Sequence, residues 1–144
     1  MNRKFWKSIV CLVAVLLFTS CGLSSNDVST RFIKEFELST ADKQITIDEL
    51  YNSYGGVPYE GIALYKLEID QNVFEEIQKW DALPYSDEVT DFIDSVSPSV
   101  DFPNIIKGYY KFINRGEDTN IIKNASLCVY DQDNGIAYYL LLDS

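Results

Sequence analysis

Near its C-terminus the chain reads LCVYDQDNGIAYYLLL over residues 127–142. Two apolar runs flank a polar centre that contains Asn-Gly, the pair favoured in two-residue hairpin turns because both central residues need positive φ. The pattern predicts two antiparallel strands, 127–130 and 136–142, joined at Asn134-Gly135.

The register of this hairpin follows from the turn. With Asn134-Gly135 as the two-residue loop, Tyr130 lies opposite Tyr139 and Cys128 opposite Leu141. That pairing would place two aromatic side chains together on one face of the hairpin.

Two further segments show the alternation of half-buried antiparallel strands, in which every second residue is apolar. One is Gly61–Ile69, with charged residues between the apolar ones. The other is residues 105–115, with Ile106, Gly108 and neighbours at alternate positions on one side. Residues 28–38 fit either a strand or a short helix.

Three segments carry helix signals. Thr46-Ile47-Asp48-Glu49 has the form of a capping box, and apolar residues at helical spacing follow it as far as Gly55-Gly56. A second helix is expected from Asn72 to Trp80, closed by Leu83-Pro84. A third should begin after Ser86, where acidic residues near the first turn complement the helix dipole.

Together these segments predict an α+β fold, with an antiparallel sheet of about four strands and two or three short helices packed on it. After removal of residues 1–20, described next, about 124 residues remain, which is the length of one domain.

The N-terminus has the pattern of an export signal. Met1–Lys7 carries three positive charges, no acid precedes Asp27, and Ile9–Phe18 is uninterrupted and apolar. A basic start followed by about 7–15 apolar residues is the secretory pattern. The run is too short to span a membrane comfortably, since a span needs about 20 residues.

The next residues, Phe18-Thr19-Ser20-Cys21, resemble the lipobox of bacterial lipoproteins. The resemblance implies diacylglycerol on the Cys21 thiol and cleavage just before it. It further implies a signal peptide at 1–20, a lipidated tether at 21–27 and a single globular domain at 28–144. The protein would then sit on the extracytoplasmic face of the cell membrane, because two or more acyl chains anchor firmly. An uncleaved anchor, or an ordinary signal peptide with an incidental cysteine, is the alternative.

Cleavage would make the net charge of the chain more negative. It removes three of the twelve basic residues and none of the 22 acids, which leaves a net charge near −13. Such a charge argues against nucleic acid, whose phosphates require basic patches. It favours cationic partners, and an envelope protein or a cationic peptide is the candidate partner, although simple solubility is the more common reason for such a charge.

The residue types exclude much of catalytic chemistry. The chain contains no histidine, so catalysis of the Ser-His-Asp and Cys-His kinds and histidine metal sites are absent. Acid–base catalysis would have to use paired carboxylates, such as Glu75-Glu76, Asp87-Glu88, or Asp91 with Asp94. These pairs fall on polar helix faces, where solvation is the default. We expect no catalytic residue, no metal site and no cofactor.

Two smaller patterns favour structural roles. Asp131-x-Asp133-x-Gly135 resembles the start of a calcium loop, but glycine stands where the loop needs a ligand. A hairpin turn is the better interpretation. Cys128 lies in an apolar run and is expected to be a small buried side chain. With Cys11 removed and Cys21 lipidated, it has no partner for an intrachain disulfide.

The glycine-rich loop at residues 55–61 is the candidate binding site. It lacks the lysine and Ser/Thr of a phosphate-binding P-loop, and its structural interpretation is a turn from the first helix to the first strand. Glycines bring backbone amides close to the surface, and loops often carry function. The candidate binding residues are Tyr54, Gly55, Gly56, Tyr59, Glu60 and Gly61.

From about Tyr54 to Ser144 the chain also resembles a group of small uncharacterised proteins from low-GC Gram-positive bacteria. Members of the group often carry histidine around the glycine loop where this chain has tyrosine, so neither a metal role nor an acid–base role is expected for the loop. The motifs that carry the resemblance are Gly55-Gly56, Glu60-Gly61, Trp80, Leu83-Pro84, Gly108–Arg115, Val129-Tyr130-Asp131, Tyr138-Tyr139 and Asp143.

The sequence therefore favours a membrane-anchored extracytoplasmic lipoprotein that acts as a non-catalytic binding module. The alternatives are a small envelope hydrolase that uses paired carboxylates and an immunity-type protein directed against cationic peptides.

Overall fold

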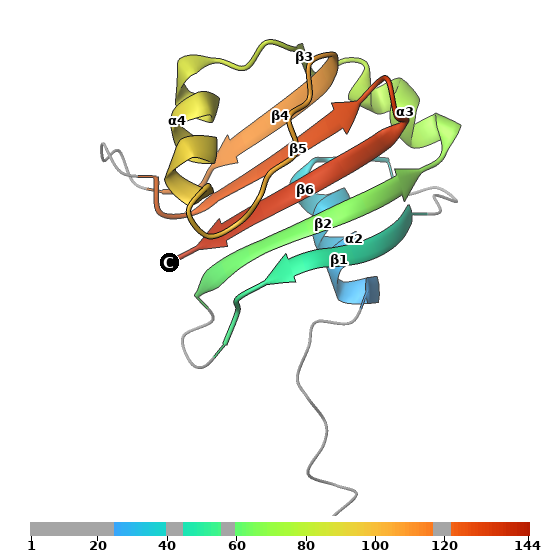
Figure 1. Ribbon diagram of the computed structural model, residues 1–144. Coiled ribbons are helices and arrows are strands. Elements are labelled where there is room, and N and C mark those ends of the chain that lie inside the picture. The colour runs from blue at the N-terminus through green and yellow to red at the C-terminus, as the bar shows by residue number, and fades with distance from the viewer. Residues whose placement is uncertain (1–24, 40–44, 56–59, 117–121) are drawn as a thin grey trace, which may run out of the picture.

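The computed structural model describes residues 25–39, 45–55, 60–116 and 122–144. Within them, one antiparallel sheet of six strands carries helices on both of its faces (Figure 1). The α+β fold with an antiparallel sheet is thus confirmed. In chain order the elements are α2 (Ser25–Glu35), β1 (Ile45–Asn52), β2 (Gly61–Ile69), α3 (Gln71–Ile77), β3 (Asp81–Ala82), α4 (Asp87–Val96), β4 (Gly108–Asn114), β5 (Ala125–Asp131) and β6 (Ile136–Asp143).

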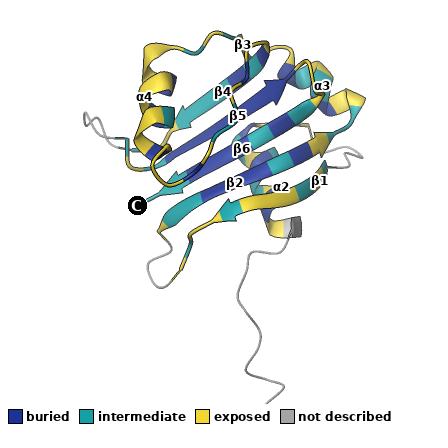
Figure 2. Cartoon of the chain, viewed as in Figure 1, coloured by how far each residue is buried: buried dark blue, intermediate teal, exposed yellow. Residues whose placement is uncertain are grey.

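The strand order is β1-β2-β6-β5-β4-β3, so the last two strands of the chain lie at the centre of the sheet. Every residue of β5 is buried, which Figure 2 shows as an unbroken dark strand. A strand that is covered on both faces reads as a continuous apolar run, as residues 127–130 do. The predicted number of about four strands was too low because the segment of β1 was predicted as a helix and the two-residue β3 was not predicted.

The C-terminal hairpin forms, but its predicted register was wrong. Asp131 pairs with Ile136, and Cys128 pairs with Tyr139 instead of Leu141. The loop has four residues, and Asp131 stabilises it by accepting hydrogen bonds from the backbone N–H groups of Asp133 and Asn134 at 3.0 and 3.2 Å. Only Gly135 has positive φ, so the two-residue turn is not used. A shift of two residues keeps every side chain on its predicted face.

The helix predicted from Thr46 is also wrong, because this segment is strand β1. Residues 45–49 pair in antiparallel register with residues 65–69 of β2, with an irregularity between Glu49 and Tyr51. Ile45 and Ile47 pack against the core while Thr46 and Asp48 are exposed. Pairing with β2 and this alternation outweigh the capping box, since tertiary context overrides local propensity.

The other predicted helices form. Residues 28–38, left open between strand and helix, lie mainly in α2, which begins at Ser25. Helix α3 is capped by the Asp70 side chain, two residues before the predicted start at Asn72. Helix α4 begins where predicted, with the Ser86 hydroxyl accepting a hydrogen bond from the backbone N–H of Val89.

Helices on opposite faces create two apolar cores, because each helix must bury its apolar stripe against the sheet. The first core joins α2 and α3 to one face, with the Phe32 and Phe36 rings in contact with Tyr139 at centroid distances of 5.2 and 5.5 Å. The second core lies under α4, where Phe92 is fully buried and contacts Phe112.

Strand β4 begins at Gly108, three residues later than predicted, because the preceding segment crosses the α4 face as a loop. Ile106, expected on a strand face, is 83 % exposed. A Cβ atom at Gly108 would lie 1.8 Å from the carbonyl oxygen of Tyr130. The close approach of the two backbones therefore requires glycine at this strand start.

Candidate functional site

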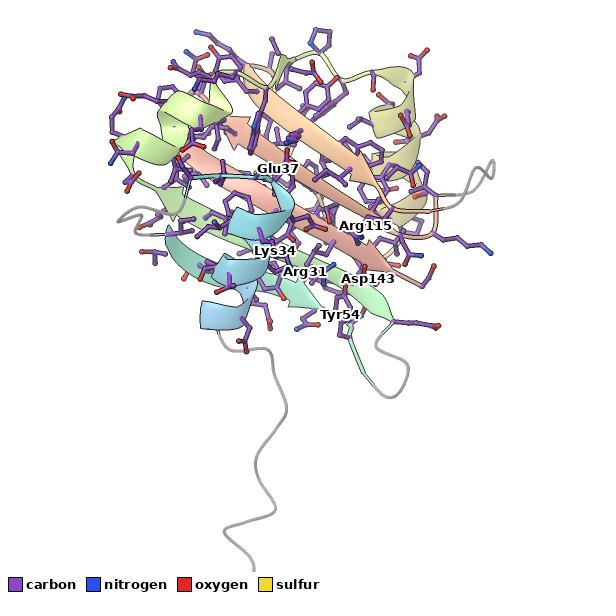
Figure 3. The ribbon with its side chains drawn as sticks, turned by 180° about the vertical axis from the view of Figure 1, so that it is seen from behind. Arg31, Lys34, Glu37, Tyr54, Arg115 and Asp143 are labelled. Atoms are coloured by element: carbon purple, nitrogen blue, oxygen red, sulfur yellow. The ribbon has the colours of Figure 1, made fainter. Side chains whose placement is uncertain are left out.

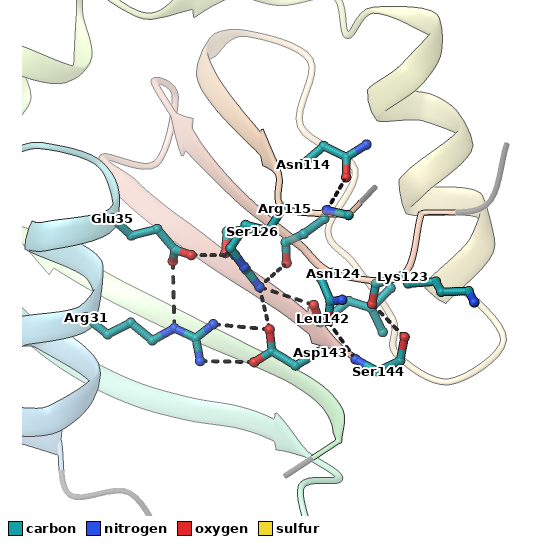
Figure 4. A network of polar contacts seen from close by, with 12 residues as sticks. Arg31, Glu35, Asn114, Arg115, Lys123, Asn124, Ser126, Leu142, Asp143 and Ser144 are labelled. Carbon is teal, nitrogen blue, oxygen red and sulfur yellow. Dashed lines mark hydrogen bonds and ion pairs between the residues drawn. The ribbon is translucent and has the colours of Figure 1, made fainter. Parts of the chain in front are cut away.

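Two arginines and two carboxylates from distant parts of the chain meet at one end of the sheet (Figure 4). Arg31 of α2 donates to both carboxylate oxygens of Asp143 at 3.1 and 3.3 Å. It also lies 3.9 Å from Glu35, one helical turn further on. Arg115, just after β4, donates to Glu35 and to Asp143. Each carboxylate is thus shared by both arginines, and these four residues are called the arginine–carboxylate network.

Two tyrosines extend this network. The Tyr54 hydroxyl donates to Asp143 at 2.7 Å, and the Tyr139 hydroxyl donates to Glu35. Burial, together with these hydrogen bonds to carboxylates, raises the pKa of both phenols above its usual value. Burial alone would raise the pKa of Asp143, but the hydrogen bonds from Arg31 and Tyr54 and the nearby arginine charges bring that pKa below its usual value.

The network has the properties of a structural feature that stabilises the fold. The two positive charges are matched by two negative ones, and the Glu35 and Asp143 side chains are only 12 % and 22 % exposed. A carboxylate held charged by arginine is a poor general acid, which needs a raised pKa. The arrangement instead ties α2 to the end of β6, as the view in Figure 3 shows. An ion pair of 3.3 Å between Lys111 and Glu37 adds a second tie to the end of α2.

The predicted binding loop joins β1 to β2, and not a helix to a strand as expected, because the segment before it is β1. Gly55 and Glu60 form an isolated antiparallel bridge at its base. The hydroxyl of Tyr54 is engaged by Asp143, while Glu60 is exposed. Gly61 is partly buried at the start of β2. Gly56 and Tyr59 lie outside the described residues.

The carboxylate pairs do not form an enclosed site. Asp87, Glu88, Asp91 and Asp94 are all exposed along α4. On α3, Glu75 is exposed and Glu76 accepts a hydrogen bond from the backbone N–H of Ser39 at 3.0 Å. In the described parts of the chain, no group of three or more His, Cys, Asp or Glu residues could hold a metal ion.

Cys128 is fully buried in the first core, as expected for a small apolar side chain. Burial raises the pKa of its thiol, which disfavours the reactive thiolate. Cys21, the predicted lipidation site, lies outside the described residues. None of the described helices has the length and apolar content required to cross a membrane.

The strongest charge asymmetry of the described chain lies on and around α4. From Trp80 to Ile106 the sequence holds six acids and no Lys or Arg. All six are exposed, and none makes an ion pair with another described residue. We call this set the α4 acidic surface; its members are Asp81, Asp87, Glu88, Asp91, Asp94 and Asp101.

A hollow of about 200 Å³ opens beside this surface, between α4 and the loop that follows it. We call it the α4 pocket. The Tyr85 hydroxyl has no hydrogen-bond partner in the described structure, and burial raises its pKa. The residues that line the pocket include Tyr85, Ile93, Asp94, Phe102, Pro103 and Ile105.

A second hollow, of about 400 Å³, runs along α2. Its described lining comes entirely from residues 30–38, including Ile33, Lys34 and Glu37. A hollow lined by one helix and its end is a surface groove, and Glu37 is already paired with Lys111.

Comparison with known proteins adds no relative. No family model, no curated protein and no solved structure matches the chain. The resemblances to the lipobox and to the Gram-positive group therefore stay predictions.

Neither the arginine–carboxylate network nor the α4 pocket was predicted from the sequence. One signal was available for the network: Arg31 and Arg115 are the only two arginines after residue 20. Arginine is preferred to lysine where a planar fork must bind carboxylates bidentately. For the pocket there was no local signal, because its lining comes from α4 and a loop whose path depends on the sheet below.

Proposed function

We propose that the protein is a membrane-anchored extracytoplasmic lipoprotein that binds a basic peptide or protein without catalysing a reaction. The α4 acidic surface carries this proposal. Six exposed acids without counter-charges generate a negative potential that attracts cationic partners and accelerates their association.

The distribution of the basic residues strengthens the case. Both arginines of the segment after residue 20 form their ion pairs within the arginine–carboxylate network. Lys111 is paired with Glu37 on the α2 side of the sheet. Neither the arginine–carboxylate network nor the Lys111–Glu37 pair therefore neutralises the acids around α4.

The proposed anchor is compatible with an accessible α4. Cys21 precedes the first residue of α2 by four positions, a reach of at most about 14 Å. Helices α2 and α4 lie on opposite faces of the sheet (Figure 1). The helix through which the anchor enters is therefore not the one that carries the acidic surface.

The test uses the purified lipidated chain in a neutral detergent and a fluorescent dodecalysine peptide as the probe, followed by anisotropy. The triple variant Asp87→Asn/Asp91→Asn/Asp101→Asn should weaken binding by about tenfold or more, which corresponds to about 1.4 kcal/mol. Added salt should weaken binding to the unaltered chain, because exposed charges are screened.

The matched control removes three exposed acids elsewhere, in Asp48→Asn/Glu68→Gln/Glu75→Gln. It changes the net charge by the same amount, and its affinity should fall by less than about twofold if the site is local. Equal losses in the two triple variants would show that dodecalysine responds only to net charge, and the proposed function would be wrong.

A further inference from the structure

We propose that the α4 pocket seats a single lysine side chain of the basic partner. This inference rests on the proposed function, and it adds the chemical identity of the group that is recognised.

The size of the pocket selects its occupant. At about 200 Å³ it is smaller than the range of about 300–1,000 Å³ typical of sites for cofactors and drug-sized ligands. A hollow of this size accommodates one side chain. In protein interfaces such pockets hold the anchors that contribute most of the binding energy.

The lining of the pocket matches the two parts of a lysine side chain. Ile93, Pro103 and Ile105 supply apolar atoms for the four methylene groups. Long basic side chains commonly lay their stems along apolar surface while the charged end meets polar groups. Asp94, which is exposed, supplies a carboxylate for the ammonium.

Two aromatic residues, Tyr85 and Phe102, are also part of the lining. Aromatic faces attract cations through their quadrupoles. The pocket therefore combines a carboxylate with aromatic lining, in addition to its apolar contact with the stem.

The charge of the segment that forms the pocket favours a cation over an acidic side chain. No basic residue lies between Trp80 and Ile106 to receive an acidic side chain, while five other acids surround Asp94 along this segment. A neutral apolar side chain would fill the hollow but would gain no attraction from the negative potential of these acids. Charge complementarity thus assigns the pocket to a cation.

The test is an NMR titration of the isotope-labelled, lipidated chain with three small probes. These are the blocked amino acids N-acetyl-lysine amide, N-acetyl-norleucine amide and N-acetyl-glutamate amide. Norleucine keeps an unbranched apolar side chain and lacks the ammonium group, so the comparison isolates the charge. The lysine probe should shift the amide signals of Ile93, Asp94 and Phe102 and bind about fivefold or more tightly than norleucine, at the upper range of an exposed ion pair.

A pair of variants locates the charge effect. Asp94→Asn should weaken the lysine probe by about fivefold. The control, Asp91→Asn, removes the same charge about one helical turn away but outside the residues that line the pocket, and should weaken it by less than about twofold. Phe102→Ala should reduce binding of both the lysine and the norleucine probes, since it removes apolar lining.

The outcomes separate this inference from the proposed function. Equal binding of lysine and norleucine, or shifts remote from α4, would overturn the lysine site while the dodecalysine result still stood. Conversely, a local lysine site with no difference between the triple variants would retain the pocket and overturn the wider acidic surface as the binding face.

Discussion

Asp143, the penultimate residue, accepts hydrogen bonds from Arg31, Arg115 and Tyr54. It is therefore the residue through which α2, the end of β4 and the segment after β1 are joined to β6. Removing its charge would leave two arginines short of a partner in a half-buried site, which costs more than the loss of an exposed ion pair.

Asp143→Asn should lower the free energy of unfolding at pH 7 by about 1.5–3 kcal/mol, the range for hydrogen bonds to charged groups. The folded pKa of Asp143 lies below its usual value of 3.8. Its contribution is therefore fully present above that value and is lost as the pH falls toward the folded pKa. Urea unfolding at pH 7 and at successively lower pH would measure both effects.

The difference between the Asp143→Asn variant and the unaltered chain should shrink as the pH falls below about 4. Asp101→Asn is the control, because Asp101 is exposed and unpaired, and its effect should be small at every pH. A difference that stays constant with pH would mean that the charge of Asp143 does not stabilise the fold.

At the scale of the secondary-structure elements, two capping patterns in the sequence have opposite outcomes. Ser86 caps α4 through its hydroxyl. Thr46, which begins a capping box in the sequence, lies in β1 opposite Glu68. The difference is not local: β1 has a neighbouring strand to pair with, and Ile45 and Ile47 reach the core only in the extended conformation.

Ser86→Ala should therefore destabilise the protein by about 1 kcal/mol, the usual cost of losing an N-cap side chain. Thr46→Ala, the matched control at an exposed edge position, should cost less than about half as much, since it removes no cap. Thermal or chemical unfolding of the two variants would measure the loss of stability in each. A cost for Thr46→Ala as large as that for Ser86→Ala would contradict the different roles of these two residues.

At the scale of the whole molecule, the arginine–carboxylate network links the first described helix to the last strand. The proposed lipid would enter through α2, so any force on the anchor acts on a helix held by the Arg31–Asp143 pair and by the Phe32–Tyr139 contact. The binding surface proposed on the opposite face is then carried on a sheet whose central strand β5 is buried throughout.

Cys21→Ser should abolish lipid labelling and release the protein from the membrane fraction, because the thiol is the group that the lipobox resemblance assigns to diacylglycerol. Metabolic labelling with palmitate and cell fractionation would measure both properties. Cys11→Ala, within the apolar part of the signal, is the control and should leave both unchanged. Retention of the Cys21→Ser protein in the membrane would indicate an uncleaved anchor.

Much of the fold was predictable where the signal lies between near neighbours. The alternation in Gly61–Ile69 specified β2, the Ser86 cap specified the start of α4, and the apolar surroundings of Cys128 specified its burial. These features follow from side-chain periodicity and local hydrogen bonding, which do not depend on the rest of the chain.

The candidate site was predictable only in part. Tyr54 and Gly55 were singled out for a glycine loop, and the structure joins Tyr54 to Asp143, 89 positions away. Asp91 and Asp94 were recognised as exposed acids, but their place beside a pocket depends on the path of the segment that contains Phe102. The residues next to a side chain in the sequence do not specify which distant residues it will contact.

By itself, the sequence determined the α+β class and the large negative charge, and it predicts an export signal that ends just before Cys21. The tertiary structure decided that Thr46 lies in a strand, that Cys128 pairs with Tyr139, and that Arg31 and Arg115 share two carboxylates. The physical reason is the range of the interactions. Periodicity, capping and composition act between neighbours, whereas strand register and ion pairing are settled only when segments distant along the chain pack together.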